Sequence, residues 1–122
     1  MKSNELRIGN WVEQPNNGVT RVTAILNDLQ IKTETGYVDK YCMPIPLTEE
    51  WLLKFGFELD IEDGGYQKGK YKVSVSDEGC LFFIYIGYYP EEIAEFKYVH
   101  QLQNLYFALT GEELELKEKQ DA

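Results

Sequence analysis

Nucleophilic chemistry in this chain would have to be built around His100, which is the only histidine among the 122 residues. Its candidate nucleophile partners are Cys42, Cys80, Ser74 and Ser76. An activated nucleophile needs a base within hydrogen-bond reach and a third group that orients this base. Cys80 and the two serines lie in an ordinary strand pattern, without the glycine frame of a nucleophile elbow. We therefore predict no catalytic residue.

A metal or cofactor site finds equally little support in the sequence. Cys42, Cys80 and His100 lack the close pair spacing of zinc sites. The stretch "DIEDGG" at residues 60–65 lacks the closing glutamate of a calcium loop, and "GGYQKGK" at residues 64–70 lacks the residue order of a phosphate loop. We predict no metal and no cofactor.

Paired carboxylates occur at Glu49–Glu50, Glu91–Glu92 and Glu112–Glu113. Acid–base hydrolysis needs carboxylates that converge in one cleft. Neighbouring residues of a helix point in different directions, and two of the pairs fall at expected helix starts or turns, where acids stabilise the helix dipole. The pairs therefore indicate capping and solvation, and we do not expect an enzyme.

A basic stretch supports an alternative function. Lys68, Lys70 and Lys72 are expected on one face of a strand, close to Tyr66 and Tyr71. Rings that stack on bases, next to cations that contact phosphates, are typical of proteins that bind single-stranded nucleic acid. The plainer interpretation is that the lysines form the solvated face of the strand. A nucleic-acid-binding module that uses Tyr66, Lys68, Lys70 and Lys72 is our alternative function.

The segment "KYVHQLQNLYFALTG", residues 97–111, predicts a helix with no charged residue after Lys97. Its apolar stripe consists of Val99, Leu102, Leu105, Tyr106 and Leu109. The opposite face carries His100, Asn104 and Phe107, where a solvated helix would carry Lys and Glu.

Two explanations of this uncharged face are open. Either the N-terminal β section covers it, or it is an interface, because charge depletion together with amides and an aromatic ring is interface composition. In the second case His100, Asn104 and Phe107 contact a protein partner or a second copy of the chain.

The charge balance limits the classes of partner. The net charge is −9, which disfavours nonspecific binding to phosphate backbones and anionic membranes. The opening "MKSNELRIGNW" lacks the apolar core of a signal peptide, and the longest apolar run, "CLFFIYI", is too short to span a bilayer. Two cysteines make no disulfide framework. We therefore expect a cytoplasmic protein with reduced thiols and no membrane partner.

The first third of the chain predicts strands. "NWVEQ", "VTRVTAIL", "LQIKTE" and "YVDKY" are short β-rich runs separated by turn signals. Their spacing resembles a small SH3-like barrel or a curled meander, which we expect over residues 1–45.

After residue 45 the strand pattern ends and the pattern of a short helix follows. Pro44 and Pro46 force extended backbone. Thr48 is a good N-cap, and Glu49 lies where the helix dipole favours an acid. Gly56 is suited to a left-handed helix end. We predict a short helix that starts at Glu49 and ends before Gly56.

An antiparallel meander follows, and the helix at residues 97–111 is expected to pack on it. Within the meander, the strand "CLFFIYIG" is apolar on both faces, which predicts a central strand covered on both sides. The fold class is therefore α+β. We expect one domain over residues 1–122, divisible into subdomains at 1–45 and 46–116, with a frayed acidic tail at 117–122.

Two of these segments, "PIPLTEEWLLKFGFE" and "KYVHQLQNLYFALTGEEL", resemble a family of small acidic proteins from gut Bacteroides and their phages and mobile elements. The opening "NELRIGNWV" is similar to the usual start of that family, while residues 60–70 match least well. The family has no assigned activity, so the resemblance implies a setting, a cytoplasmic accessory protein of a phage or integrated element, and no site residue.

Together these features predict a non-catalytic protein-binding accessory factor. Its acidic surface is suited to occupy a basic site on a nucleic-acid enzyme.

Overall fold

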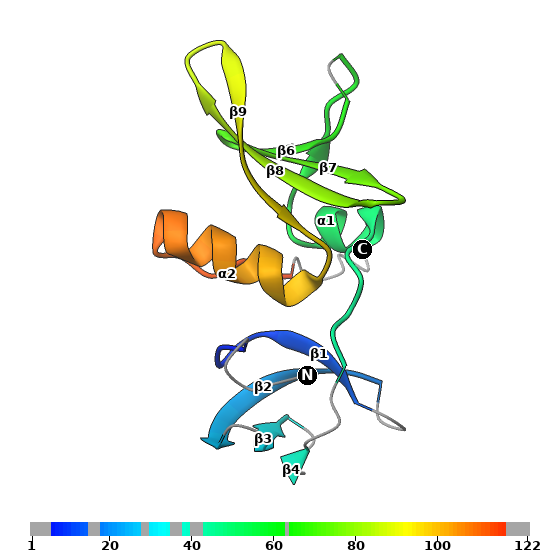
Figure 1. Ribbon diagram of the computed structural model, residues 1–122, viewed down its shortest axis with the longest axis vertical. Helices are drawn as coiled ribbons and strands as arrows, with labels where there is room; N and C mark the ends of the chain where they lie inside the picture. The colour runs from blue at the N-terminus through cyan, green and yellow to red at the C-terminus, as the bar shows by residue number, and fades with distance from the viewer. Residues whose placement is uncertain are drawn as a thin grey trace, which may run out of the picture. The chain divides into compact units, whose positions relative to one another are not determined.

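The computed structural model of the protein describes residues 6–14, 18–27, 30–34, 38–39, 43–62 and 64–116. Two antiparallel sheets and two helices confirm the predicted α+β class (Figure 1). Neither described helix is long and apolar enough to cross a membrane.

The chain divides into two compact units. The first consists of Met1–Pro46 and Tyr98–Glu112, and the second of Leu47–Lys97 and Glu113–Ala122. The division between Pro46 and Leu47 lies one residue beyond the predicted limit of the N-terminal subdomain. The C-terminal helix, which the sequence pattern assigns to the second meander, is grouped with the N-terminal strands.

The first unit contains one antiparallel sheet in the order β1-β2-β3-β4. Its strands are β1 (Trp11–Gln14), β2 (Gly18–Asn27), β3 (Gln30–Thr33) and β4 (Val38–Asp39). After β4 the backbone of Met43 pairs with Glu13 of β1, with N···O distances of 2.7 and 2.9 Å. This is a meander, and no pairing of β4 with β1 closes a barrel within the described strands.

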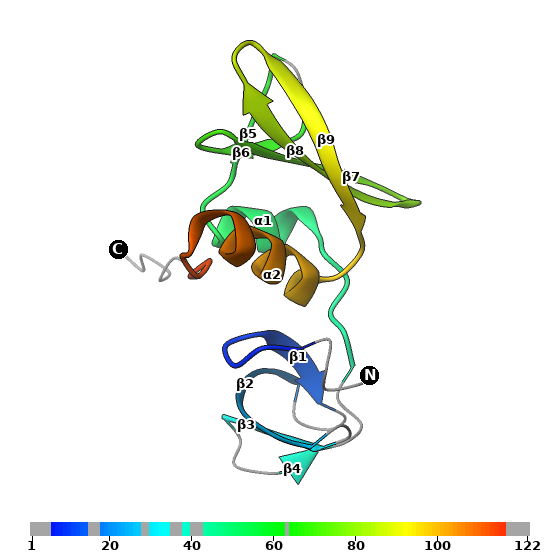
Figure 2. The ribbon, with the colours of Figure 1, turned by 60° about the vertical axis from the view of Figure 1, so that its left-hand side comes forward.

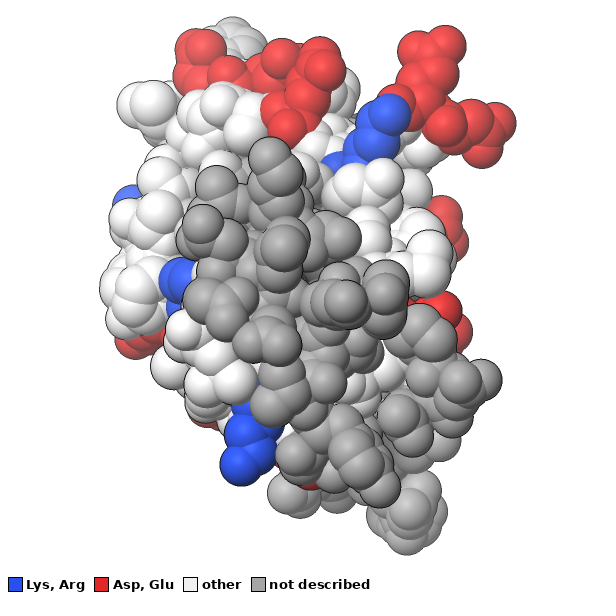
Figure 3. Space-filling view, turned by 60° about the horizontal axis from the view of Figure 1, so that its bottom comes forward, with Lys and Arg blue, Asp and Glu red and all other residues white. Residues whose placement is uncertain are grey.

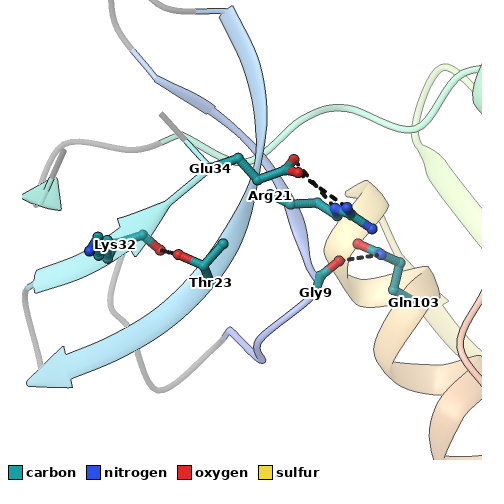
Figure 4. Close-up of polar contacts among 6 residues, drawn as sticks. All are labelled: Gly9, Arg21, Thr23, Lys32, Glu34 and Gln103. Atoms are coloured by element: carbon teal, nitrogen blue, oxygen red, sulfur yellow. Dashed lines mark hydrogen bonds and ion pairs between the residues drawn. The ribbon is translucent and has the colours of Figure 1, made fainter. Parts of the chain in front are cut away.

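The core of the first unit comes from side chains on one face of this meander. Its buried apolar cluster is Leu6, Val12, Val22 and Ile31. On the exposed side, Arg21 of β2 pairs with Glu34 at 3.1 Å (Figure 4). The hydrogen bond from Arg21 stabilises the carboxylate and lowers the pKa of Glu34.

Helix α2 (Val99–Thr110) is bound to the first sheet through a buried amide. Gln103 is 1% exposed; its Oε1 accepts a hydrogen bond from the backbone N–H of Trp11 at 2.8 Å, and its Nε2 donates to the carbonyl of Gly9 at 3.0 Å (Figure 4). A buried charge at this position would lose its hydration, whereas an amide satisfies one donor and one acceptor at once. This explains in part why α2 carries no charge.

Local signals set both ends of α2. At its start, the side chain of Gln101 accepts from the backbone N–H of Tyr98 at 3.1 Å. At its end, Gly111 has φ 75°, the left-handed conformation that the sequence predicts there.

The second unit contains α1 (Glu49–Lys54) and one antiparallel sheet in the order β5-β6-β7-β8-β9 (Figure 2). The strands are β5 (Glu58–Leu59), β6 (Tyr66–Lys68), β7 (Tyr71–Ser76), β8 (Gly79–Ile86) and β9 (Tyr89–Phe96). The Thr48 hydroxyl accepts from the N–H of Trp51 at 3.5 Å, which confirms the predicted N-cap. Gly56, with φ 92°, follows the last turn of α1 as predicted.

One face of the second sheet, here called the closed face, holds the core of this unit. Its buried side chains are Tyr66, Tyr71, Val73, Cys80, Phe82 and Phe96. The rings of Tyr71 and Phe82 lie 5.8 Å apart, which is a normal distance for aromatic contact. Lys68 Nζ donates to the carbonyl of Phe55 at 3.0 Å and so joins the closed face to the end of α1.

The opposite face corrects the prediction that β8 is covered on both sides. Phe82 is fully buried, but Leu81, Phe83 and Tyr85 on the other face of β8 are only partly buried. The helix of this unit has six residues and lies over the closed face, so no described helix of the unit covers the other face (Figures 1 and 2). The apolar composition of both faces of β8 therefore does not show that both faces are buried.

The amide of Gln103 yields a stability prediction. Gln103→Leu leaves the N–H of Trp11 and the carbonyl of Gly9 without their partner, which should lower the free energy of unfolding by about 3 kcal/mol. Gln67→Leu is the matched control, because the Gln67 side chain donates to the Gly69 carbonyl at an exposed turn. Its cost should stay below about 1 kcal/mol. Urea denaturation measures both, and equal costs would refute the role given to Gln103.

Candidate functional site

The uncharged helix face of His100, Asn104 and Phe107 is largely occupied from within the protein. His100 is 3% exposed, and its ring stacks on Tyr98 with centroids 6.0 Å apart. Asn104 Oδ1 accepts hydrogen bonds from Arg7 Nε at 2.8 Å and from Asn10 Nδ2 at 2.9 Å. Asn104 is thus held by the segment that precedes β1, as the first of the two explanations requires.

Phe107 is the one residue of the three with substantial exposure. It is 39% exposed, and the guanidinium carbon of Arg7 lies 4.4 Å from its ring centroid. Such a cation–π contact occupies one side of the ring. A partner contact through His100, Asn104 and Phe107 stays a prediction. Of these three side chains, mainly the free part of the Phe107 ring is accessible to a partner.

The lysine face is not formed as predicted. A two-residue turn at Gly69–Lys70 separates β6 from β7, and Lys68 pairs across it with Tyr71 while Gln67 pairs with Lys72. Directly paired residues point to the same side of a sheet. Lys68 therefore lies on the closed face with Tyr71, and Lys72 lies on the opposite face, because the turn interrupts the alternation of a continuous strand.

The individual lysines are also engaged internally. Lys72 has a side chain only 9% exposed, and its Nζ lies 3.6 Å from Asp60 Oδ2 and 3.5 Å from the Tyr85 hydroxyl. Lys70 is exposed, with its Nζ 5.8 Å from the ring centroid of Tyr71. Tyr66 is buried, and its burial, together with a hydrogen bond to Glu49, raises the pKa of its phenol.

Cys80 also lacks the properties of a nucleophile. It is 4% exposed, and burial raises the pKa of its thiol, the opposite of what an activated cysteine needs. Cys42 lies outside the described residues. The described part of the chain contains no group of three His, Cys, Asp or Glu side chains placed to hold a metal ion.

The face of the second sheet that α1 leaves uncovered is the first of two unassigned surfaces, and we call it the open face. It consists of Gln67, Lys72, Ser74, Leu81, Phe83 and Tyr85. A groove of about 620 Å³ runs along it between Tyr85 and the segment Glu58–Glu62. The groove wall carries two exposed carboxylates, Glu58 and Glu62, beside exposed Leu59 and Ile61.

The end of the β8–β9 hairpin is the second surface. Ile86, Tyr88 and Tyr89, here called the hairpin tip, are 69%, 94% and 76% exposed. The N–H of Tyr85 donates to the Lys70 carbonyl at 2.8 Å, and past this bond β8 pairs with no described strand other than β9. Figure 1 shows it projecting from the sheet. Ile86 and Tyr89 are directly paired across the hairpin and Tyr88 lies in the turn, so three large exposed side chains lie at one end of it. Exposed apolar surface of this kind is frequent at interaction sites.

The edge strand β9 is protected against pairing with another strand. Pro90 has no backbone donor, and the register shifts between Phe82 and Phe83, which leaves Ile93 as an extra residue in β9. Exposed Glu91, Glu92 and Glu95 add charge along the same edge. These are the features that prevent edge-to-edge association of sheets. A partner of this hairpin would therefore contact side chains and not extend the sheet.

Sequence reasoning missed the hairpin tip. The sequence pattern predicts a turn at "YYPEE", residues 88–92, and a last strand at "IAEF", residues 93–96, whereas the chain turns at Gly87–Tyr88 and β9 begins at Tyr89. The available signal was three tyrosines around one glycine, since a tight turn cannot bury large side chains on both sides.

Comparisons with known proteins add no assignment: no family model matches the chain, and no curated protein and no solved structure matches it either.

The loop before β6 yields a second stability prediction. A Cβ at Gly65 would lie 2.8 Å from Lys72 Cε and 3.1 Å from the carbonyl oxygen of Val73, whereas a Cβ at Gly64 would meet no atom within 4 Å. Both glycines have φ near the left-handed region, at 76° and 77°. Gly64→Ala should therefore cost about 1 kcal/mol of backbone strain, and Gly65→Ala about 1–2 kcal/mol more from overpacking against Lys72.

Thermal or urea unfolding of the two alanine variants measures this difference directly. Equal destabilisation would show that the loop does not pack against Lys72 as described.

Proposed function

We propose that this protein is a non-catalytic protein-binding factor that docks on a partner protein through the hairpin tip of its second unit. The supporting observation is the tip itself, where Ile86, Tyr88 and Tyr89 are the most exposed cluster of large side chains in the hairpin. Tyrosine is enriched at protein interfaces because it offers a large ring and a polar end at low conformational cost. The tip is also held by two paired strands, which reduces the entropy lost on binding.

Other exposed apolar residues support an interface less well. In the first unit, Val19, Ile25 and Leu26 of β2 are 48%, 40% and 54% exposed. Single exposed aliphatic side chains are common on protein surfaces and need no functional explanation. The tip differs in its aromatic content, since exposed Ile8 and Ile61, at 61% and 87%, carry no ring.

The nucleic-acid alternative loses its structural support. Of its four residues, Tyr66 is buried, Lys68 is bonded to the Phe55 carbonyl, and Lys72 is paired with Asp60. Lys70 alone cannot supply the continuous basic track that phosphate binding needs. Where Figure 3 draws described side chains, the Lys and Arg side chains appear as separate groups and form no continuous patch.

The biological setting follows only from the family resemblance. A cytoplasmic accessory protein of a phage or mobile element would act by occupying a host or phage protein, and the charge of −9 suits a basic target site. This setting remains a prediction.

Site-specific photo-crosslinking tests the proposal. A photo-crosslinking amino acid replaces Tyr88 at the tip or, as the control, Val19 on β2 of the first unit, which is also exposed. Irradiation of cells that naturally encode the protein should give a discrete protein adduct from position 88 and not from position 19. Equal adducts from both positions, or no adduct from position 88, would overturn the proposal.

A further inference from the structure

The β8–β9 hairpin has an unusual charge distribution. From Gly79 to Phe96 it contains three glutamates, Glu91, Glu92 and Glu95, and no Lys, Arg, Asp or His. The tip itself is uncharged, and the first two carboxylates follow Tyr89 after a single proline. An apolar tip is thus followed directly by a carboxylate collar, Glu91 and Glu92.

The collar is available for outside contacts. Glu91 and Glu92 are both exposed, and neither forms an ion pair or a side-chain hydrogen bond with any other described residue. In the register of the sheet, Glu91 and Glu92 lie opposite Ile84 and Phe83, which are uncharged. Their charges are therefore not neutralised by the strand beside them.

The cations of the neighbouring strand pair do not compensate the collar. Lys72 is buried and pairs with Asp60 on the far side of β8 from β9. Lys70 places its ammonium near the ring of Tyr71. The groove on the open face adds two further exposed carboxylates, Glu58 and Glu62, beside Tyr85.

A symmetric contact between the tips of two copies of the chain is disfavoured. Two hairpin tips that meet in a symmetric contact would bring two carboxylate collars together, and like charges across an interface cost several kcal/mol. The complementary surface is an apolar pocket with basic residues at its rim.

We propose that the hairpin tip inserts into an apolar pocket rimmed by Lys or Arg on the partner protein, with Glu91 and Glu92 pairing with this rim. The inference rests on the proposed function and adds the chemistry of the partner. Exposed charge pairs at a rim accelerate association and weaken as salt rises. The apolar tip supplies the contact area, and the collar supplies the preference for a basic partner.

The test uses the full chain with the photo-crosslinker at position 88, irradiated in lysate at about 50 mM and about 500 mM NaCl, conditions that shorten the screening length from roughly 14 to 4 Å. Three backgrounds are compared: wild type, Glu91→Gln/Glu92→Gln, and Asp77→Asn/Glu78→Gln. The last pair is exposed in the turn at the other end of β8 and removes the same charge. Adducts are identified by mass spectrometry.

The expected result is an adduct whose yield falls about tenfold at high salt and by a similar factor in the Glu91→Gln/Glu92→Gln background, and stays within about twofold of wild type in the Asp77→Asn/Glu78→Gln background. The crosslinked partner peptide should lie next to Lys or Arg residues.

Three results would overturn the inference. An adduct that is insensitive to salt and to Glu91→Gln/Glu92→Gln would remove the basic rim but leave the proposed function standing. An adduct with a second copy of this chain would replace the partner with self-association. Absence of any adduct at position 88 would overturn the proposed function together with this inference.

Discussion

The surface of the second unit depends on one constraint: β8 carries large side chains on both faces, and the unit covers only one of them. Phe82 is fully buried on the closed face, against Tyr71 and Phe96 at ring distances of 5.8 and 6.4 Å. The six-residue helix α1 lies over that face. Phe83 and Tyr85 are left partly exposed on the open face, and the same strand carries its apolar composition outward to the hairpin tip.

The exposed hairpin is protected against pairing with the strands of other molecules. A long apolar edge would invite pairing with other sheets, but Pro90, the extra residue Ile93 and the carboxylates of β9 oppose such pairing. What remains accessible is a set of side chains on a rigid support. The surface can therefore be apolar at its tip without a free strand edge beside it.

Local features of the fold were predictable from the sequence. The Thr48 N-cap, the Gly56 and Gly111 helix ends and the antiparallel meanders depend on residues close together in the chain, and the structure contains all of them. The lysine face was not predictable, because the Gly69–Lys70 turn places Lys68 and Lys72 on opposite faces. Lysines at every second position suggest one continuous strand face, and this alternation does not show where a turn divides the strand into two.

Which face of a helix or strand is buried could not be predicted from the sequence either, because burial depends on contacts between distant segments. Asn104 is fixed by Arg7, which lies 97 positions earlier, and no local pattern indicates that pairing. The uncharged face of α2 suggested an interface with a partner, and the apolar second face of β8 suggested burial. Both predictions were based on composition. Composition indicates that a side chain avoids water or charge, but it does not show what the side chain contacts.

The central claim is that Tyr88 and Tyr89 are free in the isolated protein and covered by a partner in the cell. Hydroxyl-radical footprinting of the purified protein and of intact producing cells, read by mass spectrometry at each tyrosine, tests it most directly. The account predicts fast oxidation of Tyr88 and Tyr89 in the purified protein, strong protection of both in cells, and slow oxidation of buried Tyr66 and Tyr71 in either case. Protection of Tyr88 and Tyr89 in the purified protein, or equal reactivity in the purified protein and in cells, would contradict it.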